Sequence, residues 1–235
     1  MIRYEGIKED KKRLLALTGL TGKEFEVLLK AFREVREAKD EGRAREKPKR
    51  RQRKAGGGRK PILDNDEQKL LFGLMYQKSY PIQELLGAAF EMSQSRCNYW
   101  IHELLPMLKE ALDGLGVLPE RDPKKLAKQS VTKTTGQKLI IDGTERRRQR
   151  PQDKEKQALH YSGKKKTHTD KNIVISNAKT KRVDFLSQTY PGIAHDKKIA
   201  DHESIHYPRH TTLYKDTGFQ GYEPNVKRTL QPKKT

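Results

Sequence analysis

The sequence predicts an α-helical region followed by an α/β region, because the spacing of its apolar residues changes along the chain. Up to about residue 112, apolar side chains recur every three or four positions, as in amphipathic helices. From residue 137 they form short branched runs, such as Leu139-Ile140-Ile141, which are typical of buried strands. The predicted divisions are an N-terminal helix with a basic linker (1–62), a helix-turn-helix region (63–112), a linker interrupted by Gly and Pro (113–136) and an α/β domain (137–235).

The composition favours a polyanionic partner. The 235 residues include 51 Lys and Arg against 31 Asp and Glu, so the net charge is +20, and only 33% of residues are hydrophobic. Nucleic acid is the first candidate for such a basic chain. A membrane is disfavoured, because no apolar run approaches the length of a spanning helix. The single cysteine, Cys97, excludes an intrachain disulfide and indicates a reducing cytoplasm.

The N-terminal region combines helices with a strongly basic segment. Residues 8–17 predict a charged helix, and the spacing of Thr21 and Glu24 predicts a capping box that starts an amphipathic helix running to about Lys39. Residues 43–60 then hold ten Lys or Arg and one acid. They are either an arm that follows the DNA backbone, with Arg59 and Lys60 as candidate contacts, or a solvated basic spacer.

The next region predicts a helix-turn-helix. One helix starts near Asp64 and ends before Pro81, a second follows, and a third begins at Ser93 or Ser95, with a kink or restart expected at Pro106. In this motif the exposed start of the third helix enters the major groove. The candidate contacts to bases or phosphates are Gln94, Ser95, Arg96 and Asn98. The alternative is a three-helix bundle that does not bind DNA.

The second half predicts strands that deliver two aspartates. The expected strands are Leu139–Asp142, Thr169–Ser176, Val183–Thr189 and Thr212–Asp216, with a short helix over Asp196–Asp201. Two strands thus end in an acid, Asp142 and Asp216. If these strands are neighbours, their carboxylates converge and can bind Mg²⁺ or Mn²⁺, which supports chemistry at a phosphodiester. The alternative is that Asp142 only caps a turn before Gly143.

Basic residues flank the first of these acids and indicate a groove for the DNA backbone, which would make binding sensitive to salt. They are Arg146, Arg147, Arg148, Arg150, Lys164, Lys165 and Lys166. Asp196 and Asp201 are either metal ligands or partners of the ligands, or they have surface and capping roles.

Several motifs of the second half, taken together, resemble the DDE-superfamily transposases of bacterial insertion sequences, most closely the insertion-sequence-five group. The motifs are Ile141-Asp142-Gly143-Thr144-Glu145, Arg150-Pro151, Tyr161-Ser162-Gly163-Lys164-Lys165-Lys166-Thr167-His168-Thr169, Tyr190-Pro191-Gly192, His195-Asp196-Lys197-Lys198-Ile199-Ala200-Asp201 and Asp216-Thr217-Gly218-Phe219-Gln220-Gly221-Tyr222. The resemblance covers about residues 60–235, including the helix-turn-helix.

This resemblance implies an α/β, ribonuclease-H-like catalytic domain that cleaves and joins double-stranded DNA at terminal inverted repeats with magnesium. Asp142 and Asp216 correspond to the first two catalytic acids. The family's third acid is a glutamate on a later helix, whereas the only acid after Asp216 here is Glu223, next to Pro224. We therefore expect an incomplete, C-terminally truncated domain with little or no cleavage activity.

Two readings of function follow from this resemblance. One is a transposase in the bacterial cytoplasm, associated with the nucleoid and compatible with a homo-oligomer. The alternative is a non-catalytic DNA-binding regulator or inhibitor of a full-length transposase.

Overall fold

The structure is a computed structural model that describes residues 1–46, 61–129 and 137–232. The chain divides into two compact units, Met1–Val117 and Leu118–Thr235. Each unit is described by itself. Within the described residues, no helix is both long and apolar enough to cross a membrane.

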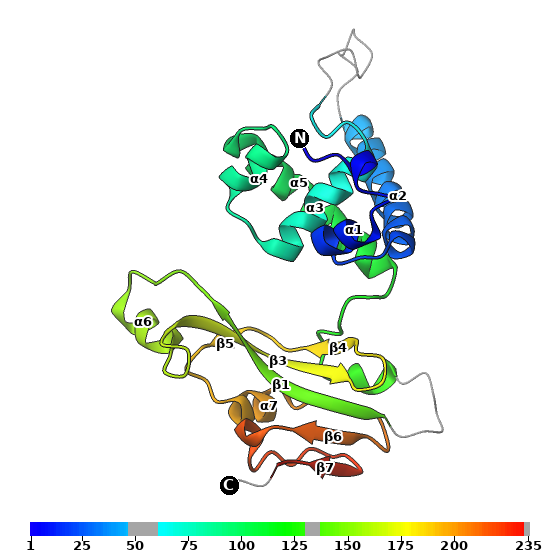
Figure 1. The fold of residues 1–235 in the computed structure, drawn as a ribbon. Helices are drawn as coiled ribbons and strands as arrows, with labels where there is room; N and C mark the ends of the chain where they lie inside the picture. Colours follow the sequence, from blue (N-terminus) through cyan, green and yellow to red (C-terminus); the bar gives the residue numbers. More distant parts are fainter. Residues whose placement is uncertain (47–60, 130–136, 233–235) are drawn as a thin grey trace. The chain divides into compact units, whose positions relative to one another are not determined.

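The first unit is helical (Figure 1). Its elements are the 3-10 helix η1 (Tyr4–Gly6) and the helices α1 (Lys11–Thr18), α2 (Gly22–Glu46), α3 (Asp66–Ser79), α4 (Gln83–Ala89) and α5 (Gln94–Gly114). The predicted capping box is present, because the Thr21 amide donates to Glu24 Oε2 over 2.8 Å and the Glu24 amide donates to Thr21 Oγ1 over 3.4 Å. Fully buried side chains of α2, α3 and α5, including Phe25, Phe32 and Leu104, share one core.

One predicted helix end in this unit was wrong, and a restart considered at Pro106 is absent. Helix α2 continues past Lys39 to Glu46 and so enters the segment predicted as a linker. Its last turns are rich in Ala, Lys, Arg and Glu, which are good helix formers, and no proline stops it before Pro48. Helix α5 is continuous through Pro106, with Leu104 and Met107 buried on either side of the proline. Packing of this face against the core compensates for the lost backbone hydrogen bond.

The second unit is built on a curled mixed sheet. In the described residues it has seven strands, in the order β2-β3-β1-β6-β7, with β4 and β5 also pairing with β3. The strands are β1 (Lys138–Arg147), β2 (Tyr161–Ser162), β3 (Thr167–Asn177), β4 (Val183–Leu186), β5 (Tyr190–Pro191), β6 (Thr212–Lys215) and β7 (Arg228–Leu230). The helices are α6 (Lys154–His160), α7 (Asp196–Glu203) and the 3-10 helices η2 (Leu126–Gln129) and η3 (Thr217–Phe219).

Strand directions in this sheet match a ribonuclease-H-like domain. Strand β1 runs antiparallel to β3 but parallel to β6, and β6 runs parallel to β7. A helical helix-turn-helix region followed by this mixed sheet is the fold class that the sequence predicted.

Strand β1 is longer than predicted. It continues past Asp142 to Arg147 and pairs with β3 as far as Arg147 with Thr169. Asp142 therefore lies inside this strand rather than at its end, and Arg146 and Arg147 belong to the β-ribbon that β1 forms with β3. The ladder between β1 and β3 holds the outer part of β1 extended, although its sequence is polar.

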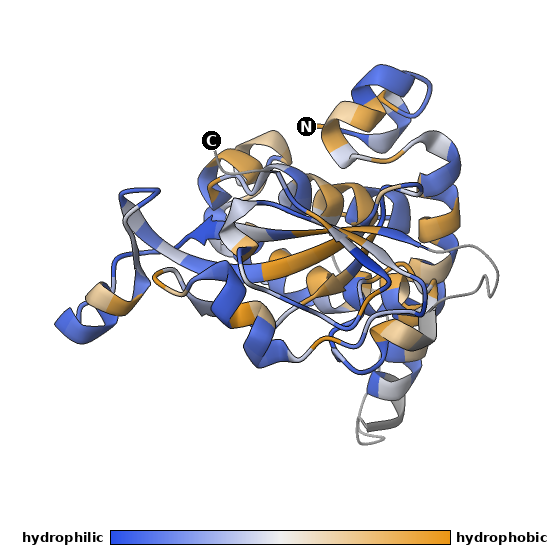
Figure 2. Cartoon of the chain, turned by 90° about the horizontal axis from the view of Figure 1, so that it is seen from below, coloured by the Kyte–Doolittle hydropathy of each residue, from blue (hydrophilic) through white to orange (hydrophobic). Residues whose placement is uncertain are grey.

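The two faces of the sheet differ in burial. Leu139, Ile141, Ile173 and Ile175 point to the face that carries the core and α7, and all four are at most 1% exposed. Ile140, between two of them on β1, is 40% exposed on the other face. The central part of the sheet is rich in hydrophobic residues, whereas the protruding ends are hydrophilic (Figure 2).

Candidate functional site

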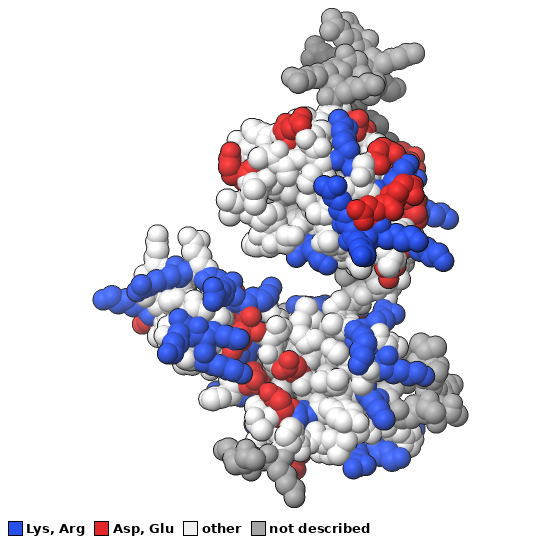
Figure 3. All heavy atoms as spheres, viewed as in Figure 1, with Lys and Arg blue, Asp and Glu red and all other residues white. Residues whose placement is uncertain are grey.

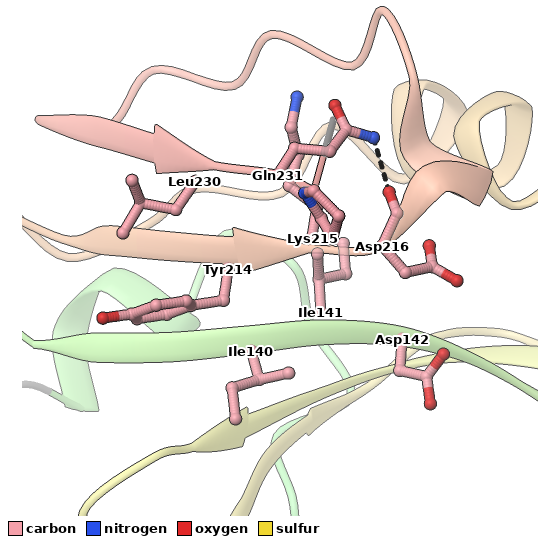
Figure 4. A pocket seen from close by; sticks show the side chains of 9 residues that line it. Ile140, Ile141, Asp142, Tyr214, Lys215, Asp216, Leu230 and Gln231 are labelled. Atoms are coloured by element: carbon pink, nitrogen blue, oxygen red, sulfur yellow. Dashed lines mark hydrogen bonds between the residues drawn. The ribbon is translucent and has the colours of Figure 1, made fainter. Parts of the chain in front are cut away.

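The parallel pairing of β1 with β6 brings Asp142 and Asp216 to neighbouring positions. The last residue pair of this ladder is Ile141 with Lys215, and the next residue on each side is an aspartate. Both aspartates line a pocket of about 650 Å³, together with residues of β1, β6 and the end of β7. Figure 4 shows both carboxylates at the same end of this pocket.

Backbone groups hold both aspartates in place. Asp142 Oδ1 accepts a hydrogen bond from the Gly143 amide over 2.8 Å, and Asp216 Oδ1 accepts one from the Gly218 amide over 3.0 Å. The Asp216 carbonyl accepts a further bond from Gln231 Nε2 over 2.5 Å (Figure 4). Both side chains are exposed, and neither forms an ion pair with a residue that the structure describes.

A third carboxylate, Asp196 at the start of α7, lies beside these two strands. A Cβ atom added at Gly143 would be 2.5 Å from Asp196 Oδ1, and one added at Gly218 would be 2.9 Å from Asp196 Oδ2 and 3.2 Å from Asp216 Oδ1. Asp196 can approach this closely because both positions are glycine. The sequence left the role of Asp196 open. In the structure, its carboxylate lies against Gly143, the residue after Asp142, and close to the carboxylate of Asp216.

Asp196 belongs to a mostly buried charge network on the covered face of the sheet. Lys171 Nζ lies 3.1 Å from Asp196 Oδ1 and 3.5 Å from Glu145 Oε1, and it donates a hydrogen bond to the Ala194 carbonyl over 2.8 Å. Glu145 also accepts a bond from Thr169 Oγ1 over 3.1 Å. Lys171 therefore bridges β1 and α7 and fixes the start of the helix that carries Asp196.

The pKa of Glu145 reflects this network. Burial alone would raise it, but hydrogen bonds from Ser162 and Thr169 and the charge of Lys171 outweigh burial and lower the pKa below its ordinary value. Glu145 is therefore a charged partner of Lys171 within the fold. Asp201, the other acid of α7 considered from the sequence, is instead exposed and pairs with Lys197 one helical turn away.

The donor set suits a hard divalent cation. Mg²⁺ prefers oxygen ligands and is usually held by one or two carboxylates, with water and substrate phosphates completing its shell. Asp142 and Asp216 supply two such carboxylates, which are exposed and form no ion pair with a described residue. Across the part of the chain that the structure describes, no group of three or more His, Cys, Asp or Glu side chains is arranged to hold a metal.

The first unit places the predicted DNA-reading residues at the start of α5. Gly87, on α4, allows the turn between α4 and α5 to pack closely against this helix, because a Cβ there would lie 2.7 Å from the Met92 carbonyl oxygen. Ser93 caps α5 by accepting from the Arg96 amide over 3.3 Å. Gln94, Ser95 and Arg96 are exposed, and Asn98 is half-buried.

Two hydrogen bonds and two cation–π contacts orient these side chains. Gln83 Oε1, on α4, accepts hydrogen bonds from Gln94 Nε2 over 2.5 Å and from Asn98 Nδ2 over 3.3 Å. The Arg96 guanidinium lies over the rings of Tyr99 and Trp100, 4.9 and 5.7 Å from their centroids. The candidate reading surface is therefore pre-ordered, and Gln83 is a member that the sequence analysis did not identify.

Lys and Arg side chains gather over the end of the sheet unit where α6 lies (Figure 3). Arg146 and Arg147 lie on β1, Arg148 and Arg150 follow it, and all four are exposed, as are the three lysines that precede β3. Those lysines are Lys164, Lys165 and Lys166. The other two predicted DNA contacts, Arg59 and Lys60, lie outside the described residues.

A helix-turn-helix region followed by a ribonuclease-H-like sheet defines a class of DNA-binding nucleases. Residues 63–114 match the family model described as helix-turn-helix of DDE superfamily endonuclease, and residues 141–234 match the model described as DDE superfamily endonuclease. Comparisons with curated proteins and with solved structures found no match. The two family matches support a DDE-superfamily transposase, a family whose endonucleases generally depend on divalent metals.

Proposed function

We propose that this protein is a transposase that cleaves and joins DNA at the ends of an insertion sequence by metal-dependent phosphoryl transfer. The observation that carries the proposal is the pair of exposed aspartates at neighbouring positions, Asp142 in β1 and Asp216 directly after the parallel strand β6, neither in an ion pair with a described residue. Its partner is double-stranded DNA with terminal inverted repeats. It acts in the bacterial cytoplasm at the nucleoid, and bringing two DNA ends together is compatible with a homo-oligomer.

In this proposal, Asp142 and Asp216 hold Mg²⁺ or Mn²⁺ through carboxylate oxygens. The bound metal supplies positive charge that stabilises the oxygens of a phosphodiester during displacement. The chain itself fixes the two carboxylates through the Gly143 and Gly218 amides. The start of α5 binds the recognition sequence, and the ring of Tyr99 orients the Arg96 guanidinium for this contact.

The second candidate is a non-catalytic DNA-binding regulator or inhibitor of a full-length transposase. It is favoured by the lack, among the described residues, of a three-carboxylate metal cluster. It retains the helix-turn-helix and the basic surface but assigns no reaction to Asp142.

The experiment is nicking of a supercoiled plasmid that carries the ends of the encoding element, with DNA binding measured in parallel by gel shift. The variants are Asp142→Asn and Asp216→Asn, with Glu223→Gln as a control that removes an exposed acid outside any helix. The transposase should nick in Mg²⁺ but not in EDTA. Both aspartate variants should then lose nicking and keep binding, whereas the control should keep both. Wild-type protein that binds the ends without nicking them supports either the regulator or the transposase with little or no cleavage activity that was expected from the sequence.

A further inference from the structure

The outer part of the β1–β3 ribbon leads to α6 at one end of the sheet unit (Figure 1). We call residues 144–171 the arm. Residues 146–166, which form most of it, hold nine Lys or Arg and two acids. The arm is therefore the part of this unit in which positive charge is most concentrated, and Figure 3 shows it as a basic surface.

Polar contacts rather than a core hold α6 on the ribbon. No residue of α6 is buried. Asp170 Oδ1 lies 2.8 Å from Arg148 Nη1 and 2.9 Å from His160 Nδ1, which links the last residue of α6 to β3 and to the residue that follows β1. A helix with no buried face gains little from hydrophobic packing. These contacts involve one end of α6 and leave most of the helix open to a ligand.

Successive side chains of β1 point to opposite faces of the ribbon. Gly143 and Glu145 face α7, as their contacts with Asp196 and Lys171 show. Arg147 continues this series and points to the same face. Asp142, Thr144 and Arg146 therefore share the other face, and Arg148 follows them where the chain leaves the strand.

Contacts across the ribbon confirm this assignment for the two arginines. Arg146 Nη2 donates to Asn172 Oδ1 over 2.9 Å, and Asn172 is paired with Thr144, which shares the face of Asp142. Arg148 Nη1 donates to Asp170, which is two residues before Asn172 on β3 and so points the same way. Arg146 and Arg148 thus form a row with Asp142, and Arg147 does not.

We infer that this row is the track along which the arm binds the phosphate backbone of duplex DNA. The inference rests on the proposed function, because it takes the reacting phosphodiester to lie at Asp142. At about 3.3 Å per strand residue, Arg146 and Arg148 lie about 13 and 20 Å from Asp142 along the ribbon. Since duplex DNA rises about 3.4 Å per base step, these guanidiniums contact phosphates about four to six steps from the reacting one.

The arginines of this row have more hydrogen-bond donors than lysines would have. A guanidinium can bind a phosphate with some of its five N–H donors while others keep a contact within the protein. Arg146 uses Nη2 for Asn172, and Arg148 uses Nη1 for Asp170. These contacts fix the direction of both side chains and leave other donors available for the DNA.

The test compares Arg146→Gln with Arg147→Gln, two neighbouring variants with the same charge change on opposite faces. Binding of the full chain to an element-end duplex is measured by fluorescence anisotropy over a range of salt concentrations. Each lost phosphate contact should reduce the slope of log affinity against log salt by about 0.9. Arg146→Gln should show this reduction and weaker binding, Arg147→Gln a much smaller change, and Arg146→Lys recovery of the wild-type slope.

Equal effects of the Arg146 and Arg147 substitutions would overturn the inference, because they would indicate a diffuse charge effect without a preferred face. Circular dichroism checks that the variants are folded. If wild-type protein does not bind the duplex at all, the proposed function fails as well. If it binds, and nicks in Mg²⁺, while the two substitutions act alike, only the track is wrong.

Discussion

Asp196 lies directly against the backbone of Gly143, so close that a Cβ atom at that position would be 2.5 Å from its Oδ1. Asp142, the residue before this glycine, is the first proposed metal ligand. The contact therefore links the start of α7 to the strand that carries the site. Any side chain at position 143 therefore meets the Asp196 carboxylate, which must shift to make room for it.

Gly143→Ala should destabilise the sheet unit and lower its activity. The added methyl group meets a carboxylate that is held by Lys171, and overpacking of this kind typically costs about 1–3 kcal/mol of unfolding free energy. Urea unfolding followed by circular dichroism measures the loss. Gly163→Ala is the matched control, because an added Cβ there meets nothing within 4 Å. Equal stability of the two variants would show that Asp196 moves away without cost.

The charge network predicts a pH dependence of stability. The pKa of Glu145 is lower in the folded protein than its ordinary value of 4.5. Its contribution is therefore complete above that ordinary value and is lost as pH falls through the lower folded value. Glu145→Gln should be less stable than wild type at pH 7, and the difference should shrink on acidification below pH 4.5. A difference that stays constant down to pH 3 would contradict the assignment.

The contact of Arg96 with Tyr99 and Trp100 predicts which variants of the reading helix lose DNA affinity. Arg96→Ala should weaken binding to the element ends by about 1–3 kcal/mol if the guanidinium reads a base, and Arg96→Lys should recover only part of this loss. Thermal stability should change little, because Arg96 is exposed. Fluorescence of Trp100, the single tryptophan, reports the contact in the same samples. Unchanged affinity in Arg96→Ala would remove this residue from the interface.

The sequence predicted local features of the fold better than it predicted the site. The capping box at Thr21 and the start of α5 follow from short patterns of side chains. The pairing of β1 with β6 could only be assumed, because it joins segments 74 positions apart, from Asp142 to Asp216. Short runs of apolar residues made these strands recognisable, but nothing in a local sequence specifies which strands are neighbours.

Other parts of the site left weak signals or none. Helix α6 has no buried face and therefore no apolar period, and its only clue is Asp153, which caps it by accepting from the Lys156 amide. The position of Asp196 depends on Gly143 and Gly218, two glycines whose small size matters only once α7 is packed against the sheet. The outer half of β1 is polar, so its strand follows from pairing with β3 rather than from its composition.

The central claim is that Asp142 and Asp216 together form one metal site. The most direct measurement is Mn²⁺ binding by electron paramagnetic resonance, with wild type, Asp142→Asn, Asp216→Asn, the double variant and Glu223→Gln. Each single aspartate variant should lose about tenfold or more in affinity. The double variant should be little worse than either, because the ligands share one ion, and Glu223→Gln should match wild type. Wild-type affinity in both single variants would contradict the claim.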